Sequence, residues 1–213
     1  MKKAAILLAI LLCMSMLAGC AKGDESKTDT AKTEETENEM KGAEENLLTG
    51  KHHVEIQVKD YGTIKVELDA DAAPITVTNF VNLAKEGFYD GLTFHRIMSG
   101  FMIQGGDPRG DGTGGSDQTI KGEFSQNGVE NNLLHTRGAI SMARSRANDS
   151  ASSQFFIVHE DSKHLDGSYA AFGYVTEGMD VVDKICEDAE PTDNNGTIPA
   201  EEQPVMTSVK VID

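Results

Sequence analysis

A glycine-rich segment could in principle bind the phosphates of a nucleotide. Residues 110–115 read Gly-Asp-Gly-Thr-Gly-Gly and fit the G-x-G-x-x-G pattern of dinucleotide-binding sites, with Glu130 twenty residues after Gly110. That pattern needs a preceding strand and an apolar helix directly after the glycines, so that the pyrophosphate rests on the helix N-terminus. No apolar helical repeat follows residue 115, and the strands predicted below do not form βαβ units. We therefore expect no nucleotide cofactor.

Potential metal ligands occur at spacings that do not suit a metal site. His159 and His164 are five residues apart, which is not a recognised zinc spacing on a helix. Asp107, Asp111 and Asp117 lack the order and the terminal glutamate of an EF-hand loop, so a solvated turn explains them better. We assign no metal and no other cofactor.

A third segment places an arginine among apolar residues. Residues 94–107 read Phe-His-Arg-Ile-Met-Ser-Gly-Phe-Met-Ile-Gln-Gly-Gly-Asp. Alone, Arg96 would more often belong to a surface ion pair, and the Phe and Met residues to a core. The whole segment, however, closely resembles the signature of the cyclophilin family of peptidyl-prolyl cis-trans isomerases. The resemblance covers residues 53–213 and none of residues 1–50, with further matching segments at 112–115, 141–143, 153–157, 165–167 and 172–173.

The chemistry of prolyl isomerisation explains why such residues are needed. An X–Pro bond rotates slowly because amide resonance must be lost, at a barrier of about 18–20 kcal/mol. In the transition state the prolyl nitrogen becomes pyramidal, so a catalyst needs a donor aimed at that nitrogen and an apolar pocket for the ring. The resemblance implies that Arg96 is this donor and that Gln104 holds Arg96 and the substrate carbonyl. It places Phe101 in the same catalytic set and in the pocket wall.

The resemblance also implies which residues bind the substrate. Some match the apolar pocket for the proline ring, and others match the groove for the residues that precede the proline. The implied substrate-binding set is His95, Met102, Ala143, Arg144, Gln154, Phe156, His164, Leu165 and Tyr169.

Three of these positions depart from the best-known members of that family. His164 stands where many eukaryotic members carry Trp, Tyr169 where they carry His, and Arg144 where Asn is common. The donor and the ring pocket are intact. Because the family's Trp donates a hydrogen bond to cyclosporin and covers part of its ring, we expect this chain to bind cyclosporin weakly.

The chain from residue 51 onward has the pattern of a mainly β fold. Apolar and polar residues alternate over 54–58 and 64–68, which predicts a hairpin. Helical spacing predicts a helix from Pro74 to Gly87 and a short one over 178–186. Many short strands with a helix near each end favour a closed eight-stranded antiparallel barrel capped by two helices, as the resemblance also implies. The remaining strands are predicted at 92–97, 101–104, 137–142, 153–158, 172–175 and 205–211.

Charge is strongly acidic and uneven along the chain. The 213 residues include 35 acidic and 19 basic side chains, a formal net charge of −16. Such a surface repels phosphate backbones, so we expect no nucleic-acid partner. Residues 21–50 hold nine of the acids and no aromatic residue. Because this stretch has too little apolar surface to offset ordering entropy, we expect residues 20–50 to form a disordered acidic tether.

The N-terminus has the pattern of a bacterial lipoprotein signal. Lys2 and Lys3 precede an apolar run, and Leu17-Ala18-Gly19-Cys20 resembles a lipobox. The apolar stretch over residues 4–18 has 15 residues, fewer than the ~20 that a membrane span needs. We therefore expect residues 1–19 to be removed. Cys20 then carries acyl chains such as palmitate and anchors the protein on the extracytoplasmic side of the cell membrane.

Together these patterns predict three parts: a signal over 1–19, lipidated Cys20 with a tether to residue 50, and an isomerase domain over 51–213. We expect a monomer without cofactors that accelerates X–Pro isomerisation in Pro-containing polypeptides during the folding of exported proteins. A second hypothesis is a non-catalytic or chaperone-like module that binds Pro-containing segments. Turnover of an Ala-Pro peptide distinguishes the two.

Overall fold

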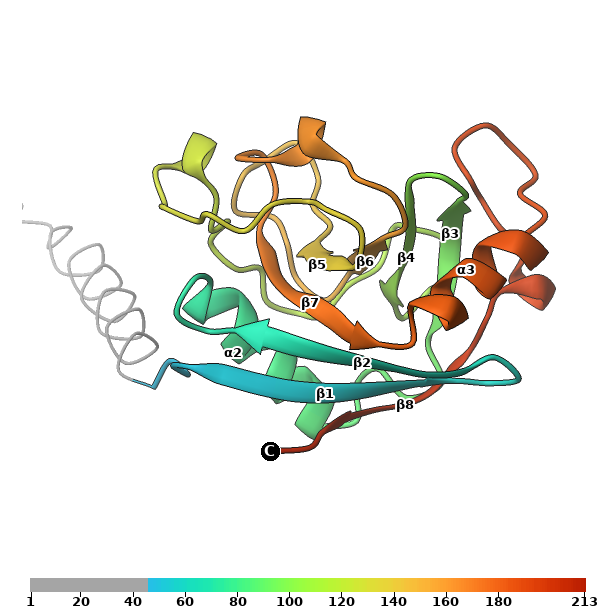
Figure 1. Ribbon diagram of the computed structural model, residues 1–213. Coiled ribbons are helices and arrows are strands. Elements are labelled where there is room, and N and C mark those ends of the chain that lie inside the picture. Colours follow the sequence, from blue (N-terminus) through green and yellow to red (C-terminus); the bar gives the residue numbers. More distant parts are fainter. Residues whose placement is uncertain (1–45) are drawn as a thin grey trace, which may run out of the picture. The chain divides into compact units, whose positions relative to one another are not determined.

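The computed structural model describes residues 46–213 (Figure 1). The expected signal peptide, Cys20 and the expected tether up to residue 45 lie outside the described residues. In residues 46–213, no helix is long and apolar enough to cross a membrane. Contacts with the folded unit begin slightly before residue 51, because Leu48 packs against the core and its N–H donates to Thr78 Oγ1 at 2.9 Å.

Among residues 46–213, eight strands and two α-helices form at or near the ranges that the periodicity predicts. The expected hairpin is confirmed, with β1 and β2 paired from Lys51–Asp69 to Val58–Gly62. The two α-helices are α2 (Pro74–Lys85) and α3 (Met179–Asp188). The strands are β1 (Lys51–Val58), β2 (Gly62–Asp69), β3 (Thr93–Met98), β4 (Met102–Asp107), β5 (Ala139–Met142), β6 (Phe155–Val158), β7 (Ala171–Glu177) and β8 (Met206–Val211).

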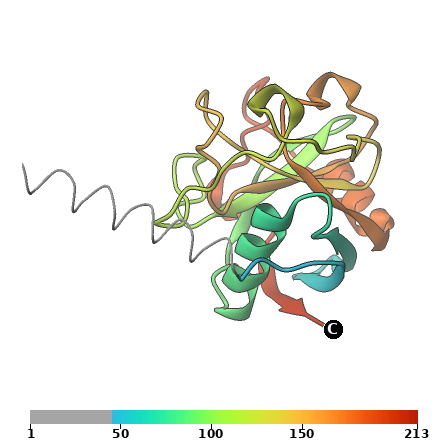
Figure 2. The ribbon, with the colours of Figure 1, turned by 90° about the vertical axis from the view of Figure 1, so that its left-hand side faces the viewer.

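The strands form one antiparallel sheet that curls into an open half-barrel, in the order β3-β4-β6-β5-β7-β2-β1-β8 (Figures 1 and 2). The predicted closure is not confirmed, because the end strands β3 and β8 share no ladder. They approach at an isolated bridge between Thr93 and Val205. Farther along, the edge of β3 bridges from Arg96 to Thr197 in a loop, and the N–H of Val209 in β8 donates to the Asp90 carboxylate. Each edge is thus occupied by a loop instead of the other strand.

An aromatic cluster fills the inside of the half-barrel. Phe80 of α2 lies 4.9 Å from Tyr89 and 5.3 Å from both Phe155 and Phe172, measured between ring centroids. Such pairs contribute about 0.5–1.5 kcal/mol each beyond the area that they bury. Cys186 of α3 belongs to the same core, and burial raises the pKa of its thiol to about 12. The thiol is therefore protonated at neutral pH.

A smaller apolar cluster lies on the opposite face of the sheet. Successive side chains of a strand point to opposite faces. In β6, Phe155 and Ile157 accordingly join the main core, whereas Phe156 and Val158 join the second cluster with Met102 of β4. The sheet therefore carries one apolar face for the core and a second that is available for a site.

Gly106 allows β4 and the segment just before β6 to approach each other closely. Its φ of +81° is in the left-handed region, and a Cβ there would lie 2.6 Å from the Ser153 carbonyl oxygen. Only glycine tolerates both conditions without a shift of the backbone.

A distant carboxylate caps the N-terminus of α2. No side chain next to the helix start caps it. Instead, the buried Glu123 accepts hydrogen bonds from the N–H groups of Ile75 at 3.0 Å and Thr76 at 2.7 Å. A carboxylate is favourable there because helix N-terminal N–H groups lack partners within the helix and carry partial positive charge. Glu123 thereby ties the segment before β5 to α2.

Glu123→Ala should lower the free energy of unfolding by about 2–4 kcal/mol, since two buried N–H groups lose their acceptor. In thermal unfolding, this corresponds to a decrease in Tm of about 5–15 °C. Glu123→Gln keeps one oxygen acceptor, so its free energy of unfolding should lie between those of the wild type and Glu123→Ala. The exposed Glu160→Ala is the matched control and should change stability by less than about 0.5 kcal/mol. Equal effects of Glu123→Ala and Glu160→Ala would contradict the capping role.

Candidate active site

Arg96 extends from β3 over the second apolar cluster. Its Nη1 donates to Gln104 Oε1 at 3.1 Å and its Nε to the Asn195 carbonyl oxygen at 2.7 Å. Nη2 lies 3.1 Å from Met98 Sδ, and the guanidinium carbon lies 6.0 Å from the centre of the Phe101 ring. Burial lowers the pKa of Arg96, but an arginine stays charged at neutral pH. The guanidinium is therefore held in place by neutral acceptors and keeps its charge.

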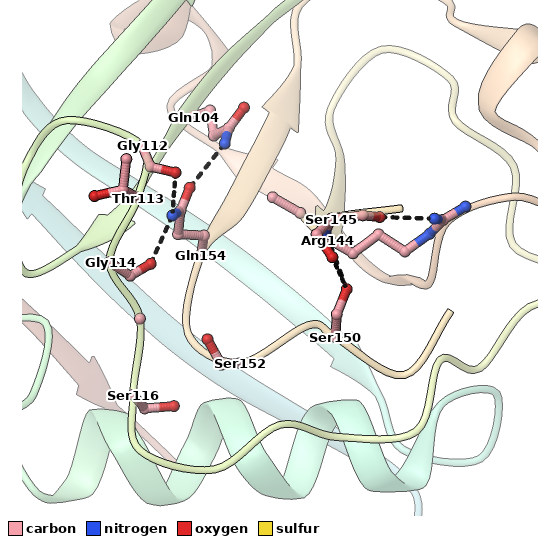
Figure 3. Close-up of a pocket in the computed structure, with 12 residues that line it drawn as sticks. Gln104, Gly112, Thr113, Gly114, Ser116, Arg144, Ser145, Ser150, Ser152 and Gln154 are labelled. Carbon is pink, nitrogen blue, oxygen red and sulfur yellow. Dashed lines mark hydrogen bonds between the residues drawn. The ribbon is translucent and has the colours of Figure 1, made fainter. Parts of the chain in front are cut away.

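A chain of amides continues from Arg96 into the neighbouring loop. Gln104 Nε2 donates to Gln154 Oε1 at 2.9 Å. Gln154 Nε2 donates in turn to the carbonyl oxygens of Gly114 at 2.7 Å and Gly112 at 3.2 Å (Figure 3). The glycine-rich segment that resembled a nucleotide motif thus supports Gln154 through its backbone.

An apolar cavity of about 150 Å³ opens beside the guanidinium. This volume is well below that of a drug-sized pocket, about 300–1,000 Å³, and suits one small ring. Arg96 and Gln104 provide polar groups at its edge, and its only other charged residue is Arg144. The lining residues are Arg96, Phe101, Met102, Gln104, Ala143, Arg144, Phe156, Leu165 and Tyr169.

Buried polar residues support the cavity from behind. The His135 ring is stacked on Phe156, with centroids 6.0 Å apart and planes 18° from parallel. Its nitrogens lie 3.0 Å from Asp166 Oδ1 and 3.0 Å from Ser141 Oγ. Burial lowers the pKa of His135 despite the opposing effect of Asp166, so the ring is neutral at neutral pH. Ser141 is fully buried and therefore unavailable as a nucleophile, although it completes a Ser-His-Asp arrangement.

A second cavity of about 340 Å³ adjoins the first. Glycine, serine and amide groups dominate its lining (Figure 3). Three residues, Gln104, Ala143 and Arg144, line both cavities. An extended peptide with its proline in the small cavity could therefore place neighbouring residues in the larger one.

Most of the predicted site residues come together around these two cavities. His95 and His164 do not line either cavity. His95 is buried, and neither of its ring nitrogens has a partner among the described residues. His164 is exposed at the rim, with its ring 5.5 Å from that of Phe101.

Asn195 was not predicted from the sequence as part of the site. Its carbonyl oxygen accepts a hydrogen bond from Arg96, although the two residues are 99 positions apart in the sequence. Asn195 belongs to a turn in which the Asp193 carboxylate accepts from the N–H groups of Asn195 and Thr197. The Asp-Asn-Asn-Gly segment at 193–196 is a recognisable turn signal, but it does not reveal what the turn contacts.

Comparisons with known proteins identify the family of this chain. The family described as cyclophilin type peptidyl-prolyl cis-trans isomerase/CLD matches residues 53–211. Peptidyl-prolyl cis-trans isomerase B of Bacillus subtilis is 51% identical over 123 residues, 58% of this chain and 82% of the relative. A Helicobacter pylori peptidyl-prolyl cis-trans isomerase is 50% identical over 126 residues, 58% of this chain and 74% of the relative.

Solved structures show the same relationship. A Cryptosporidium parvum cyclophilin type isomerase, crystallised in the presence of the dipeptide Ala-Pro, aligns with a TM-score of 0.66 and 29% identity. The alignment covers 76% of this chain and 99% of that one. With an apolar cavity beside a fixed guanidinium, a family match over nearly the whole folded unit and curated relatives of this activity, the chain belongs to the cyclophilin-type peptidyl-prolyl cis-trans isomerases.

Proposed function

We propose that this isomerase acts on X–Pro bonds of exported polypeptides from a lipid-anchored position, with Arg96 as the donor to the prolyl nitrogen. The observation that carries the catalytic part is the guanidinium of Arg96, fixed by Gln104 and Asn195 at the edge of the small apolar cavity. A proline ring in that cavity would place its nitrogen near a positive donor.

The donor has capacity left for the substrate. A guanidinium has five N–H groups, and the hydrogen bonds to Gln104 and Asn195 use two of them. Contacts with the thioethers of Met98 and Met102 are weak, because thioether sulfur is a poor acceptor. As rotation makes the prolyl nitrogen pyramidal, its lone pair becomes available and the hydrogen bond strengthens. The interaction therefore favours the transition state over either ground state.

The pocket contributes by holding the ring while the rest of the chain rotates. Phe156, Met102 and Leu165 are almost completely buried and present a rigid apolar surface. The crystallisation of the Cryptosporidium parvum relative with Ala-Pro supports a proline-containing ligand for this cavity.

The proposed location rests on the sequence before residue 46. The lipobox-like segment ending in Cys20 supports lipidation, and the acidic residues that follow support a tether of about 30 Å mean reach for thirty residues. Such a tether would keep the domain close to polypeptides that emerge from the membrane.

Arg96→Ala should reduce kcat by about 10²–10³, since one preorganised donor is lost while the ring pocket remains. Substrate affinity should change less than kcat, because the interaction is made mainly in the transition state. Arg96→Lys should recover little, since an ammonium cannot reproduce the planar fork that reaches Gln104 and the substrate together. Phe156→Ala should weaken affinity as well as turnover.

NMR exchange on an Ala-Pro peptide measures affinity and isomerisation rate in one sample. If Arg96→Ala keeps more than about a third of the wild-type kcat/KM, a loss below ~0.7 kcal/mol, the donor role is wrong and a peptide-binding module becomes the better description.

Cys20→Ala should move the protein from membranes to the soluble exported fraction or leave it unprocessed, because the acylated thiol is lost. Fractionation and metabolic labelling with palmitate test this. Activity of the folded unit should stay the same, because the residues that line both cavities come from the segment 96–169. Normal processing and unchanged membrane association would refute the lipoprotein assignment.

His164→Trp should increase cyclosporin affinity by about 10–100-fold, or ~1.4–2.8 kcal/mol. Indole would cover more surface beside Phe101 than the exposed imidazole does and would add an N–H donor. Calorimetric titration measures the change, with the exposed neighbour Lys163→Ala as the control. Tight binding by the unmodified chain would show that His164 does not limit the affinity.

A further inference from the structure

We propose that Arg144 is a positioning residue that sets the affinity for the polypeptide segment preceding the proline. This inference rests on the proposed function and concerns the same groove. It starts from the position of Arg144, one of three residues that line both cavities and the only charged residue among them.

The guanidinium of Arg144 connects two loops. Its Nη2 and Nε donate to the Ser168 carbonyl oxygen at 2.7 and 3.0 Å, and its Nη1 donates to the Ser145 carbonyl oxygen at 3.0 Å. Ser168 lies 24 residues after Arg144 in the sequence and follows the short 3₁₀ helix η2 (Lys163–Leu165). In Figure 3 the side chain extends away from Gln154, and a dashed line marks its hydrogen bond to the Ser145 carbonyl oxygen. Three of the five N–H groups of the guanidinium are therefore used within the protein, and Arg144 acts on a substrate mainly through its neighbours.

Two aromatic rings fix the same group. The guanidinium carbon lies 4.7 Å from the centre of the Tyr169 ring and 5.0 Å from that of Phe124. Both distances are within the range of cation–π attraction, which contributes about 0.5–2 kcal/mol per pair. A lysine in this position could approach one ring, but it has no planar group to combine stacking with two parallel donors.

These contacts reach the walls of both cavities. Tyr169 is edge-on to Phe156, with centroids 6.0 Å apart and planes at 83°, so it completes the small cavity. On the other side, Ser145 is held by Ser150, whose hydroxyl accepts from the Ser145 N–H at 3.0 Å, and both line the larger cavity. Arg144 thus stabilises the point where a bound chain passes from one cavity to the other.

The location predicts a specific kinetic effect. Arg96 serves the prolyl nitrogen, so the chemical step does not need Arg144. If the loop shifts when Arg144 is removed, binding of the substrate and binding of the transition state weaken equally. Such a uniform loss of binding raises KM and leaves kcat nearly unchanged. The effect should depend on length, because only peptides with several residues before the proline reach the larger cavity.

The experiment compares Arg144→Ala, Arg144→Lys and Arg144→Met with Arg146→Ala, an exposed arginine in the same loop. NMR titration and exchange use two peptides, one with a single residue before the proline and one with four. Arg144→Ala should raise KM and Kd for the longer peptide by about fivefold to thirtyfold, from the loss of cation–π and hydrogen-bond contacts. Its kcat should stay within about threefold. The shorter peptide should be affected less than about threefold, and Arg144→Lys should recover little.

Arg146→Ala should have the same KM, Kd and kcat as the wild type. This control distinguishes an effect of the stacked guanidinium of Arg144 from an effect of positive charge in the loop. Arg144→Met keeps an apolar stem of similar length and serves if the Ala variant does not fold, as judged by its thermal transition. A fall in kcat with unchanged KM, equal effects on both peptides, or full recovery by lysine would each overturn the inference. Failure of the proposed function is distinguishable, because it appears as an active Arg96→Ala variant, whereas Kd for Arg144 variants is measured without turnover.

Discussion

In β6, Phe155 and Ile157 point into the aromatic core while Phe156 and Val158 point to the opposite face, and this alternation constrains everything built on the sheet. The core side chains fix the position of the strand, and the backbone then fixes where the ring of Phe156 stands. β4 follows the same rule, with Ile103 in the core and Met102 in the second cluster. The pocket wall thus takes its rigidity from the core on one side and from the His135 ring stacked behind Phe156 on the other.

The polar groups of the site are arranged differently, because they depend on loops that are distant in the sequence. Gln154 is held by carbonyl oxygens of Gly112 and Gly114, and Arg96 by that of Asn195. Backbone carbonyl oxygens in turns are acceptors with a fixed position, and they do not become protonated themselves. Loops carried by a rigid sheet can therefore orient donors while the strands provide the apolar surface.

This division explains how much the sequence could predict. Local periodicity identified the β1–β2 hairpin and α2, because each of them buries one face at regular spacing. It could not predict that Glu123 caps α2 or that Asn195 holds Arg96, since these contacts join residues far apart and leave no local pattern. The family resemblance supplied most pocket residues by position, yet it did not place His95 inside the protein.

The predicted closure of the barrel was not confirmed for a related reason. The alternation of apolar and polar residues predicts how many strands form. It does not show whether the first and last strands of the sheet pair with each other. Here Thr197 occupies the edge of β3 and Asp90 that of β8, and neither contact has a signature in the strands themselves.

The partners of Arg96 leave its positive charge uncompensated. Among residues 46–213, no carboxylate lies within salt-bridge distance of this guanidinium. Asp193, the acid that influences its pKa, instead spends its carboxylate on the N–H groups of Asn195 and Thr197, which lowers the pKa of Asp193. Direct pairing with Asp193 would offset the positive charge of the guanidinium and occupy its donors. Because the Asp193 carboxylate orders the turn and the hydrogen-bond acceptors of Arg96 among residues 46–213 are neutral, the guanidinium stays oriented and its charge stays uncompensated, as preorganised stabilisation of a developing lone pair requires.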